Sequence, residues 1–180
     1  MINAIKPKNK PVMVECAATL YLDADEVDNS HVAERVLAEG YREQTERHVT
    51  IIGNSAGLAI KEALDKYSPE QKQQYLDIIK NLLNQLDWKF KPKDFYHIQK
   101  NGTFSGGGEL FEERESYIRV IKMPGMEKLY KNINNLLDLK IPTQFPHITL
   151  FSRGERQNPL WYGIGISSKE KFKELNPIKI

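Results

Sequence analysis

Two short runs of this sequence carry the residue types from which an acid–base site is built. Residues 47–52 read R-H-V-T-I-I, and residues 146–151 read P-H-I-T-L-F. The chain has four histidines, and two of them stand in the same frame: histidine, an aliphatic residue, threonine and two apolar residues. Imidazole titrates close to neutral pH, so a neutral ring accepts a proton while a protonated ring donates one. The repeated frame therefore predicts paired general acid–base chemistry.

The threonine in each run adds a hydroxyl that can donate a hydrogen bond to an anionic oxygen. Such a set suits a phosphodiester: one histidine takes a proton from the nucleophile and the other protonates the leaving oxygen. His48 and His147 are thus the catalytic candidates, and Thr50 and Thr149 are the candidates for phosphate binding. This chemistry needs no cofactor. We expect no metal site, because no pair of histidines has the short spacing of common zinc motifs.

Strands must position these groups. Side chains alternate along a strand, so His48 and Thr50 point one way while Val49 and Ile51 point toward a core. The second run has the same pattern. If both strands are central and related by a pseudo-twofold axis, as an internal duplication would make them, their polar faces line one cleft.

Two H-x-T motifs on strands, separated by a strand–helix unit, resemble the 2H phosphoesterase superfamily over roughly residues 19–167. That group includes bacterial RNA 2′,5′-ligase-like proteins, cyclic phosphodiesterases, and viral enzymes that degrade 2′-5′ oligoadenylates or cyclic dinucleotides. The resemblance implies a bilobal fold around a central cleft, with His48 and His147 as the catalytic acid and base. It implies phosphate binding by Thr50 and Thr149, and its phage members suggest an anti-defence role. Which histidine is the acid stays open.

Helical and strand patterns alternate along the chain, which indicates an α+β fold with α/β-like alternation. We expect a duplicated, bilobal fold with two small, mostly antiparallel sheets and flanking helices around the cleft. Strands are expected at residues 19–23, 47–52, 94–100, 116–122, 147–151 and 160–167, and helices at residues 30–39, within 55–86, and from Pro124 onward. Ser68 followed by Pro69 predicts a helix start inside the long helical stretch.

A chain of 180 residues fits one domain, at roughly 150 residues per domain. We expect residues 1–11 to be a flexible basic arm and residues 12–180 to be one bilobal domain. The tail at residues 168–180 is polar and is expected at the surface. The glycine-rich residues 101–108 are interpreted as a hairpin connection, with a mobile lid as the secondary hypothesis.

Other side chains are candidates for holding the rest of a nucleotide. Arg153, close in sequence to Thr149, is expected to reach a phosphate, and Tyr162 is expected to stack on a base. Alternatives remain open for both roles: Trp161, Phe145 and Tyr21 for stacking, and Arg119 and Arg47 for phosphate, although alternation turns Arg47 away from His48. His31 is expected at the surface, and His97 is expected to be structural.

Composition limits the partners. The formal net charge is +2, from 26 Lys and Arg against 24 Asp and Glu, which argues against a protein that holds long duplex nucleic acid by charge. A small nucleotide, a cyclic oligonucleotide or an RNA end fits better. The single cysteine, Cys16, excludes an internal disulfide and a cysteine zinc cluster, and no run resembles a signal peptide or a membrane span. We therefore expect a cytoplasmic protein. Its oligomeric state is left open.

The function expected from these residues is a metal-independent phosphodiesterase acting on a 2′,3′-cyclic phosphate, a 2′-5′ linkage or a small cyclic oligonucleotide. The alternative is a catalytically silent module of the same fold that binds a nucleotide or an RNA end. A ligase is a weaker third hypothesis, because hydrolysis dominates in dilute water.

Overall fold

The computed structural model describes residues 3–105, 109–154 and 164–180, and the side chains of these residues except 101–105 and 109–112. Within them, eight strands form a single antiparallel sheet in the order β1-β2-β4-β7-β6-β5-β8, with β3 paired to β7. The strands are β1 (Val12–Val14), β2 (Ala17–Leu22), β3 (Arg42–Glu43), β4 (Arg47–Ile52), β5 (Lys91–Ser105), β6 (Glu109–Lys122), β7 (His147–Arg153) and β8 (Ile178–Lys179). The helices are α1 (Ser30–Ala38), α2 (Asn54–Leu64), α3 (Pro69–Gln85), α4 (Pro124–Leu137) and α5 (Lys169–Glu174), with a short 3₁₀ turn, η1 (Ala24–Glu26).

The α+β class is confirmed, but the two sheets expected from the sequence are one. Val49 of β4 pairs with Ile148 of β7, and this contact joins the strands of the N-terminal half to those of the C-terminal half. Each motif strand is therefore internal to the sheet. The two halves of the chain therefore meet through direct pairing of β4 with β7.

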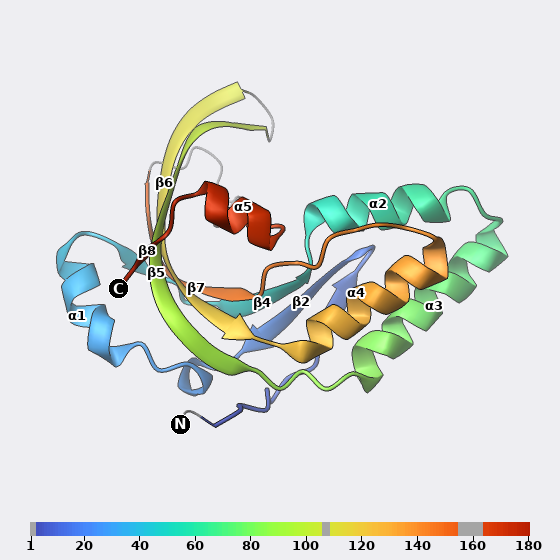
Figure 1. The fold of residues 1–180 in the computed structure, drawn as a ribbon, viewed down its shortest axis with the longest axis horizontal. Coiled ribbons are helices and arrows are strands. Elements are labelled where there is room, and N and C mark those ends of the chain that lie inside the picture. The colour runs from blue at the N-terminus through green and yellow to red at the C-terminus, as the bar shows by residue number, and fades with distance from the viewer. Residues whose placement is uncertain (1–2, 106–108, 155–163) are drawn as a thin grey trace.

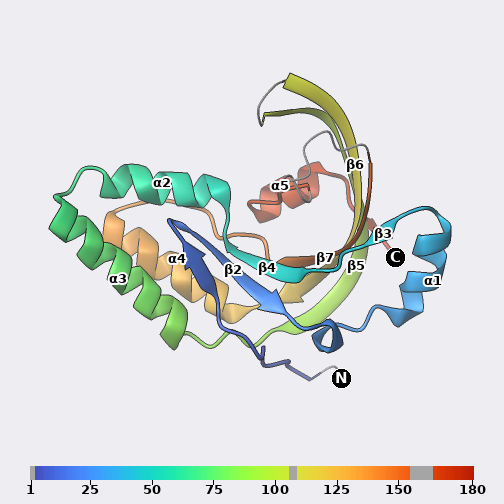
Figure 2. The same ribbon diagram turned by 180° about the vertical axis from the view of Figure 1, so that it is seen from behind.

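The sheet is strongly curved (Figure 1). The long β5–β6 hairpin bends around α5, which lies on the inner side of the curve, while α1 lies on its outer side. Helices α2, α3 and α4 gather at the other end of the molecule, as the view from behind also shows (Figure 2). The curve thus brings α5 toward the central strands β4 and β7.

Apolar residues separate into two clusters. The larger cluster contains the residues that alternate with the motif residues, namely Val49, Ile51, Ile148 and Leu150, as the alternation predicts. The smaller cluster consists of Ile98, Ile118, Ile164 and Ile166, and Phe172 of α5 packs against it. Side chains of both central strands are therefore fixed from the core side.

The long helical stretch at residues 55–86 is two helices, α2 and α3. Ser68 caps α3, as predicted: its side chain accepts a hydrogen bond from the Gln71 backbone N–H at 3.3 Å, and Pro69 is the first helical residue. The break allows α3 to turn back and pack against α4. None of the described helices combines the length and apolar character that a membrane crossing requires.

The β5–β6 hairpin is longer than predicted. Its ladder runs from Lys91 opposite Lys122 to Ser105 opposite Glu109, so strand pairing extends into the glycine-rich segment. The described part of that segment, residues 101–105, is therefore paired strand and not a connection. The remaining residues, 106–108, lie outside the described residues, as does the secondary hypothesis of a lid.

The C-terminal region differs from expectation in two ways. The strand expected at residues 160–167 is not formed in its described part, where Ile164 and Ile166 are buried in an irregular segment outside the sheet. The tail is mostly exposed, as expected, but it also packs against the rest of the molecule. Phe172 of α5 stacks on Phe145 with ring centroids 4.3 Å apart, and Ile178 of β8 pairs with His97 of β5. Apolar residues among the lysines account for this packing.

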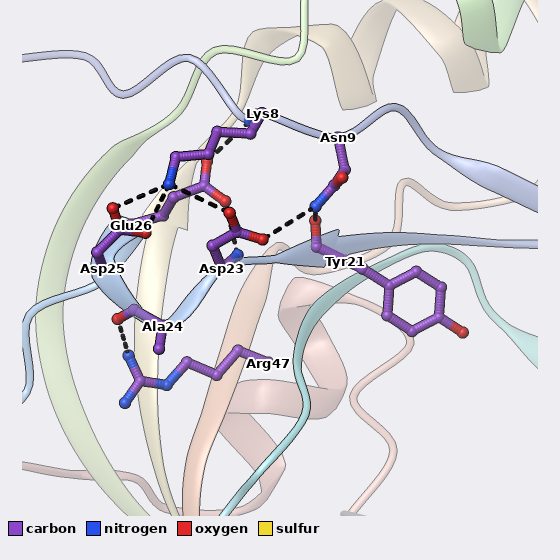
Figure 3. A network of polar contacts seen from close by, with 8 residues as sticks. All are labelled: Lys8, Asn9, Tyr21, Asp23, Ala24, Asp25, Glu26 and Arg47. Carbon is purple, nitrogen blue, oxygen red and sulfur yellow. Dashed lines mark hydrogen bonds and ion pairs between the residues drawn. The ribbon is translucent and has the colours of Figure 1, made fainter.

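The described part of the N-terminal arm is attached to the domain, which corrects the expected loose arm. The backbone of Ile5 exchanges hydrogen bonds with Phe90 at 2.8 and 3.0 Å. Lys8 lies among the carboxylates of the segment after β2, with its Nζ 3.1 Å from Asp23 and 2.9 Å from Asp25 (Figure 3). Complementary charge therefore holds the basic arm against an acidic segment.

Candidate active site

The two H-x-T motifs lie side by side on neighbouring strands. Val49 and Ile148 are paired across β4 and β7, and both are fully buried. Their sequence neighbours point to the opposite face of the sheet, because side chains alternate along each strand. That face carries His48, Thr50, His147 and Thr149, and we call it the motif face. The four sequence-predicted residues at the centre of the site are thus brought together.

The antiparallel register arranges these four groups as a crossed pair. His48 lies across from Thr149, and Thr50 lies across from His147. The histidines are diagonal neighbours, for which strand geometry gives a separation of about 7–8 Å. All four side chains are half-buried. Each imidazole therefore has the hydroxyl of the other motif as its cross-strand neighbour.

The His147 ring is fixed by its own strand. Its Nδ1 lies 2.8 Å from the Phe145 carbonyl oxygen, which only accepts, so Nδ1 carries the hydrogen and donates it. Burial has the largest effect on the pKa of His147 and lowers it, the contact with the Phe145 carbonyl raises it, and a positive charge on His48 lowers it, so that together they bring it from 6.5 to about 4. The neutral ring leaves the Nε2 lone pair available.

His48 has a different environment. Burial lowers its pKa, while the carboxylate of Glu46 opposes this effect. The Nδ1 atom of His48 lies 3.5 Å from Glu46 Oε1, and it has no hydrogen-bond partner within the described part of the chain. Glu46 was not predicted from the sequence. Alternation could have identified it, because it lies two residues before His48 and so belongs to the same face.

Helix α4 and the loop that follows it hold the two motif strands. The Tyr130 hydroxyl of α4 donates to the Ile51 carbonyl of β4 at 3.1 Å. The Asn134 side chain, near the end of α4, donates to the carbonyl and accepts from the N–H of Ile141 in the loop, both at 2.9 Å. Gln144 then donates to the Ile166 carbonyl, and the Pro146 carbonyl accepts from Ile121. The segment entering β7 is therefore fixed up to the residue before His147.

Two aromatic rings flank the histidines, one on each side. Tyr21 pairs with His48 across β2 and β4, with ring centroids 6.3 Å apart, and is 40% exposed. Phe145 stacks on His147 at 6.1 Å and on Phe172 at 4.3 Å, so its ring is already engaged within the protein. Of these two stacking candidates, Tyr21 has an open ring. Tyr162 and Trp161 lie outside the described residues.

Arg153 does not lie with the motif residues. Its Nη1 donates to the Glu39 carbonyl at 2.8 Å and its Nη2 to the Glu115 carboxylate at 3.0 Å. Its guanidinium also lies over the Tyr41 ring, 4.4 Å from the centroid. These contacts join the chain after α1 to the sheet and give the arginine a structural role.

A bulge in β7 explains this placement. One step along β6, from Ile118 to Tyr117, faces two steps along β7, from Thr149 to Phe151. The extra residue reverses the alternation, so Arg153 shares the core side with Phe151. The expectation that Arg153 reaches a substrate phosphate is corrected on this ground, since a bulge has no signal in the run of residues.

The other candidates also face away from the motif residues. Arg47 is buried and donates to the carbonyls of Ala24 and Val27, in agreement with the alternation argument. Arg119 is opposite Ile148 in the ladder, and its guanidinium lies 4.0 Å from the centre of the Phe95 ring. His97 lies 3.1 Å from Glu115, and its structural interpretation agrees with this contact.

Comparisons with known proteins identify no relative: no family model, no curated protein and no solved structure matches this chain. Within the described residues, no group of three or more histidine, cysteine, aspartate or glutamate side chains is arranged to hold a metal ion. Any functional argument therefore depends on the geometry of the motif face.

Proposed function

We propose that this protein is a phosphodiesterase that cleaves a ribonucleotide phosphodiester by acid–base catalysis with His48 and His147. The observation that carries this proposal is the crossed arrangement of two imidazoles and two hydroxyls on the motif face. In this mechanism one ring removes a proton from the nucleophile while the other protonates the departing ribose oxygen. Every proton transfer is assigned to a side chain, so the mechanism requires no metal.

Thr50 and Thr149 support the same reaction. Charge builds up on the non-bridging phosphate oxygens as the nucleophile approaches, and hydroxyl donors fixed on strands stabilise that charge without reorganising. Because the threonines come from different strands, they would hold a phosphate between the two histidines. In a 2′,3′-cyclic phosphate, the bond to water oxygen forms and the bond to one ribose oxygen breaks.

Tyr21 supports a nucleotide as the substrate. Its ring is open, it lies next to His48, and its backbone carbonyl accepts a hydrogen bond from the Asn9 side chain at 3.1 Å (Figure 3). The side chain in that view extends away from the charged cluster around Lys8. Stacking of a base on a tyrosine is tolerant of base identity. We propose a small nucleotide, a cyclic oligonucleotide or an RNA end, met in the cytoplasm.

A substrate panel tests this proposal. The chelator-treated protein is incubated with nucleoside 2′,3′-cyclic phosphates, 2′-5′-linked oligoadenylate and small cyclic oligonucleotides, and the products are separated by chromatography. We expect cleavage in at least one class that persists in chelator. His48→Ala and His147→Ala should each lower the rate by about 10²- to 10⁴-fold.

The control is His31→Ala, which removes an exposed histidine of α1 and should leave the rate unchanged. Cleavage that disappears in chelator and returns with added metal would contradict the mechanism. Saturable binding without turnover of any member of the panel would favour the silent binding module instead.

A further inference from the structure

The two catalytic candidates have different partners at the same position in their motifs. In each motif the residue two positions before the histidine contacts the imidazole Nδ1. For His147 the contact is the main-chain carbonyl of Phe145, at 2.8 Å. For His48 it is the side-chain carboxylate of Glu46, at 3.5 Å. The two motifs therefore share the offset of two residues but differ in the acceptor, which is neutral for His147 and charged for His48.

The chemical difference between these acceptors matters for proton transfer. A carbonyl dipole fixes one tautomer of a neutral ring and leaves its other nitrogen as a proton acceptor. A carboxylate carries a full negative charge and favours the imidazolium form. A ring held in that form is a proton donor. The residue two positions before the histidine thus favours a base at His147 and an acid at His48.

We propose that Glu46 is a positioning residue that pairs with Nδ1–H of His48, making His48 the proton donor and His147 the proton acceptor. This inference rests on the proposed function and assigns the roles that the duplicated motif leaves open. The Glu46 side chain is 67% exposed, so it is free to close the remaining gap when the ring is protonated. His48 Nε2 then faces the leaving oxygen.

Three titratable groups approach His48 in the described structure: Glu46, just before the same strand, Tyr21 from β2, with its ring 6.3 Å away, and His147 from β7. Of these three, Glu46 is the group that brings a negative charge near neutral pH. Replacing its carboxylate with an amide therefore isolates the proposed effect.

The test is an NMR titration of the imidazole resonances in the free protein, wild type against Glu46→Gln. The matched control is Glu34→Gln, which removes an exposed carboxylate of α1 that has no ion pair in the described residues. In Glu46→Gln we expect the His48 titration midpoint to fall by roughly 0.2–0.7 pH unit, the range for a partly exposed ion pair. The His147 midpoint should not move, and Glu46→Asp should restore part of the change.

A His48 midpoint that is the same in wild type and Glu46→Gln would overturn the inference, whether or not the protein cleaves any substrate. Because this readout needs no substrate, it is independent of the substrate panel. Where cleavage is measurable, the alkaline limb of kcat/KM should move to lower pH in Glu46→Gln by the same amount as the titration. A uniform loss of rate at every pH would mean that Glu46 has a structural role only.

Discussion

At the scale of single residues, the site consists of two imidazoles and two hydroxyls whose backs are closed by aliphatic side chains. Val49 and Ile148 fix the strands, and the polar groups emerge on the other face as a crossed set. The histidines differ in the partner of Nδ1, which is a main-chain carbonyl for His147 and a carboxylate for His48, so the repeated frame does not give two equivalent groups. A pair that transfers protons requires one histidine that donates and one that accepts, so the two rings must differ chemically.

The threonines are predicted to contribute less than the histidines. Thr50→Val and Thr149→Val keep the shape of the side chain and remove the hydroxyl donor. We expect each to lower kcat by about 2- to 10-fold, since one neutral hydrogen bond contributes roughly 0.5–1.5 kcal/mol. Steady-state kinetics on the best substrate of the panel measures this. A loss equal to that of His48→Ala would show that the hydroxyls do more than bind the phosphate.

Tyr21 is predicted to act in binding rather than in chemistry. Tyr21→Phe keeps the ring and should leave KM close to that of the wild type. Tyr21→Ala should raise KM by roughly 5- to 150-fold, because a base–aromatic stack contributes about 1–3 kcal/mol. Equal KM values for the alanine variant and the wild type would exclude Tyr21 as the residue that stacks on the base and would favour Tyr162 instead.

At the scale of elements, α4 and the loop after it are what bring the second motif into place. Tyr130 connects α4 to β4, and Asn134 and Gln144 fix the loop that leads into β7. The helix can lie this close to the sheet only if its first turn approaches the connection between α3 and β5. That approach occurs at Gly125.

Two glycines allow the close packing of α4 to be tested, because a Cβ would meet a different kind of atom at each. A Cβ at Gly125 would lie 2.5 Å from the Asp87 carbonyl oxygen, a backbone atom, whereas a Cβ at Gly53 would lie 2.7 Å from Oε1 of Gln144, the end of a side chain. We expect Gly125→Ala to destabilise the fold by roughly 1–3 kcal/mol, and Gly53→Ala by less. Thermal unfolding measures both. An unchanged midpoint for Gly125→Ala would contradict the packing described for α4.

Local patterns predicted much of this element structure. Alternation identified β4 with its exact bounds, and the Ser68–Pro69 pair identified the start of α3, because both signals depend on neighbouring residues alone. The pairing of Val49 with Ile148 and the bulge that turns Arg153 away depend on contacts between distant segments. The same is true of the packing of α5 on Phe145. No local pattern in a single sequence carries that information.

At the scale of the whole molecule, the two halves meet through strand pairing in a single curved sheet (Figure 1). Acidic and basic residues are nearly balanced, with 24 against 26, and part of the basic arm is neutralised by the carboxylates around Lys8. Weak overall charge leaves recognition to local contacts. This suits a small ligand better than an extended polyanion.

The charge balance predicts selectivity between nucleic-acid classes. At physiological salt, fluorescence anisotropy should detect no saturable binding of a long RNA duplex at protein concentrations that saturate with the cleaved nucleotide. The physical reason is that counterion release provides little binding energy when few lysines and arginines contact phosphates. Tight, strongly salt-dependent duplex binding would show that a local basic surface dominates over the net charge.

The most direct test of the central claim, that His48 and His147 work as a proton-transferring couple, is the pH dependence of kcat/KM measured in chelator. Burial lowers the pKa of both histidines. The base, His147, is therefore neutral above about pH 4, and the acid, His48, has a pKa below the ordinary value of 6.5. We predict a bell-shaped profile with its maximum on the acid side of pH 6.5. A flat profile between about pH 5 and 8, or cleavage that requires a metal, would contradict the account.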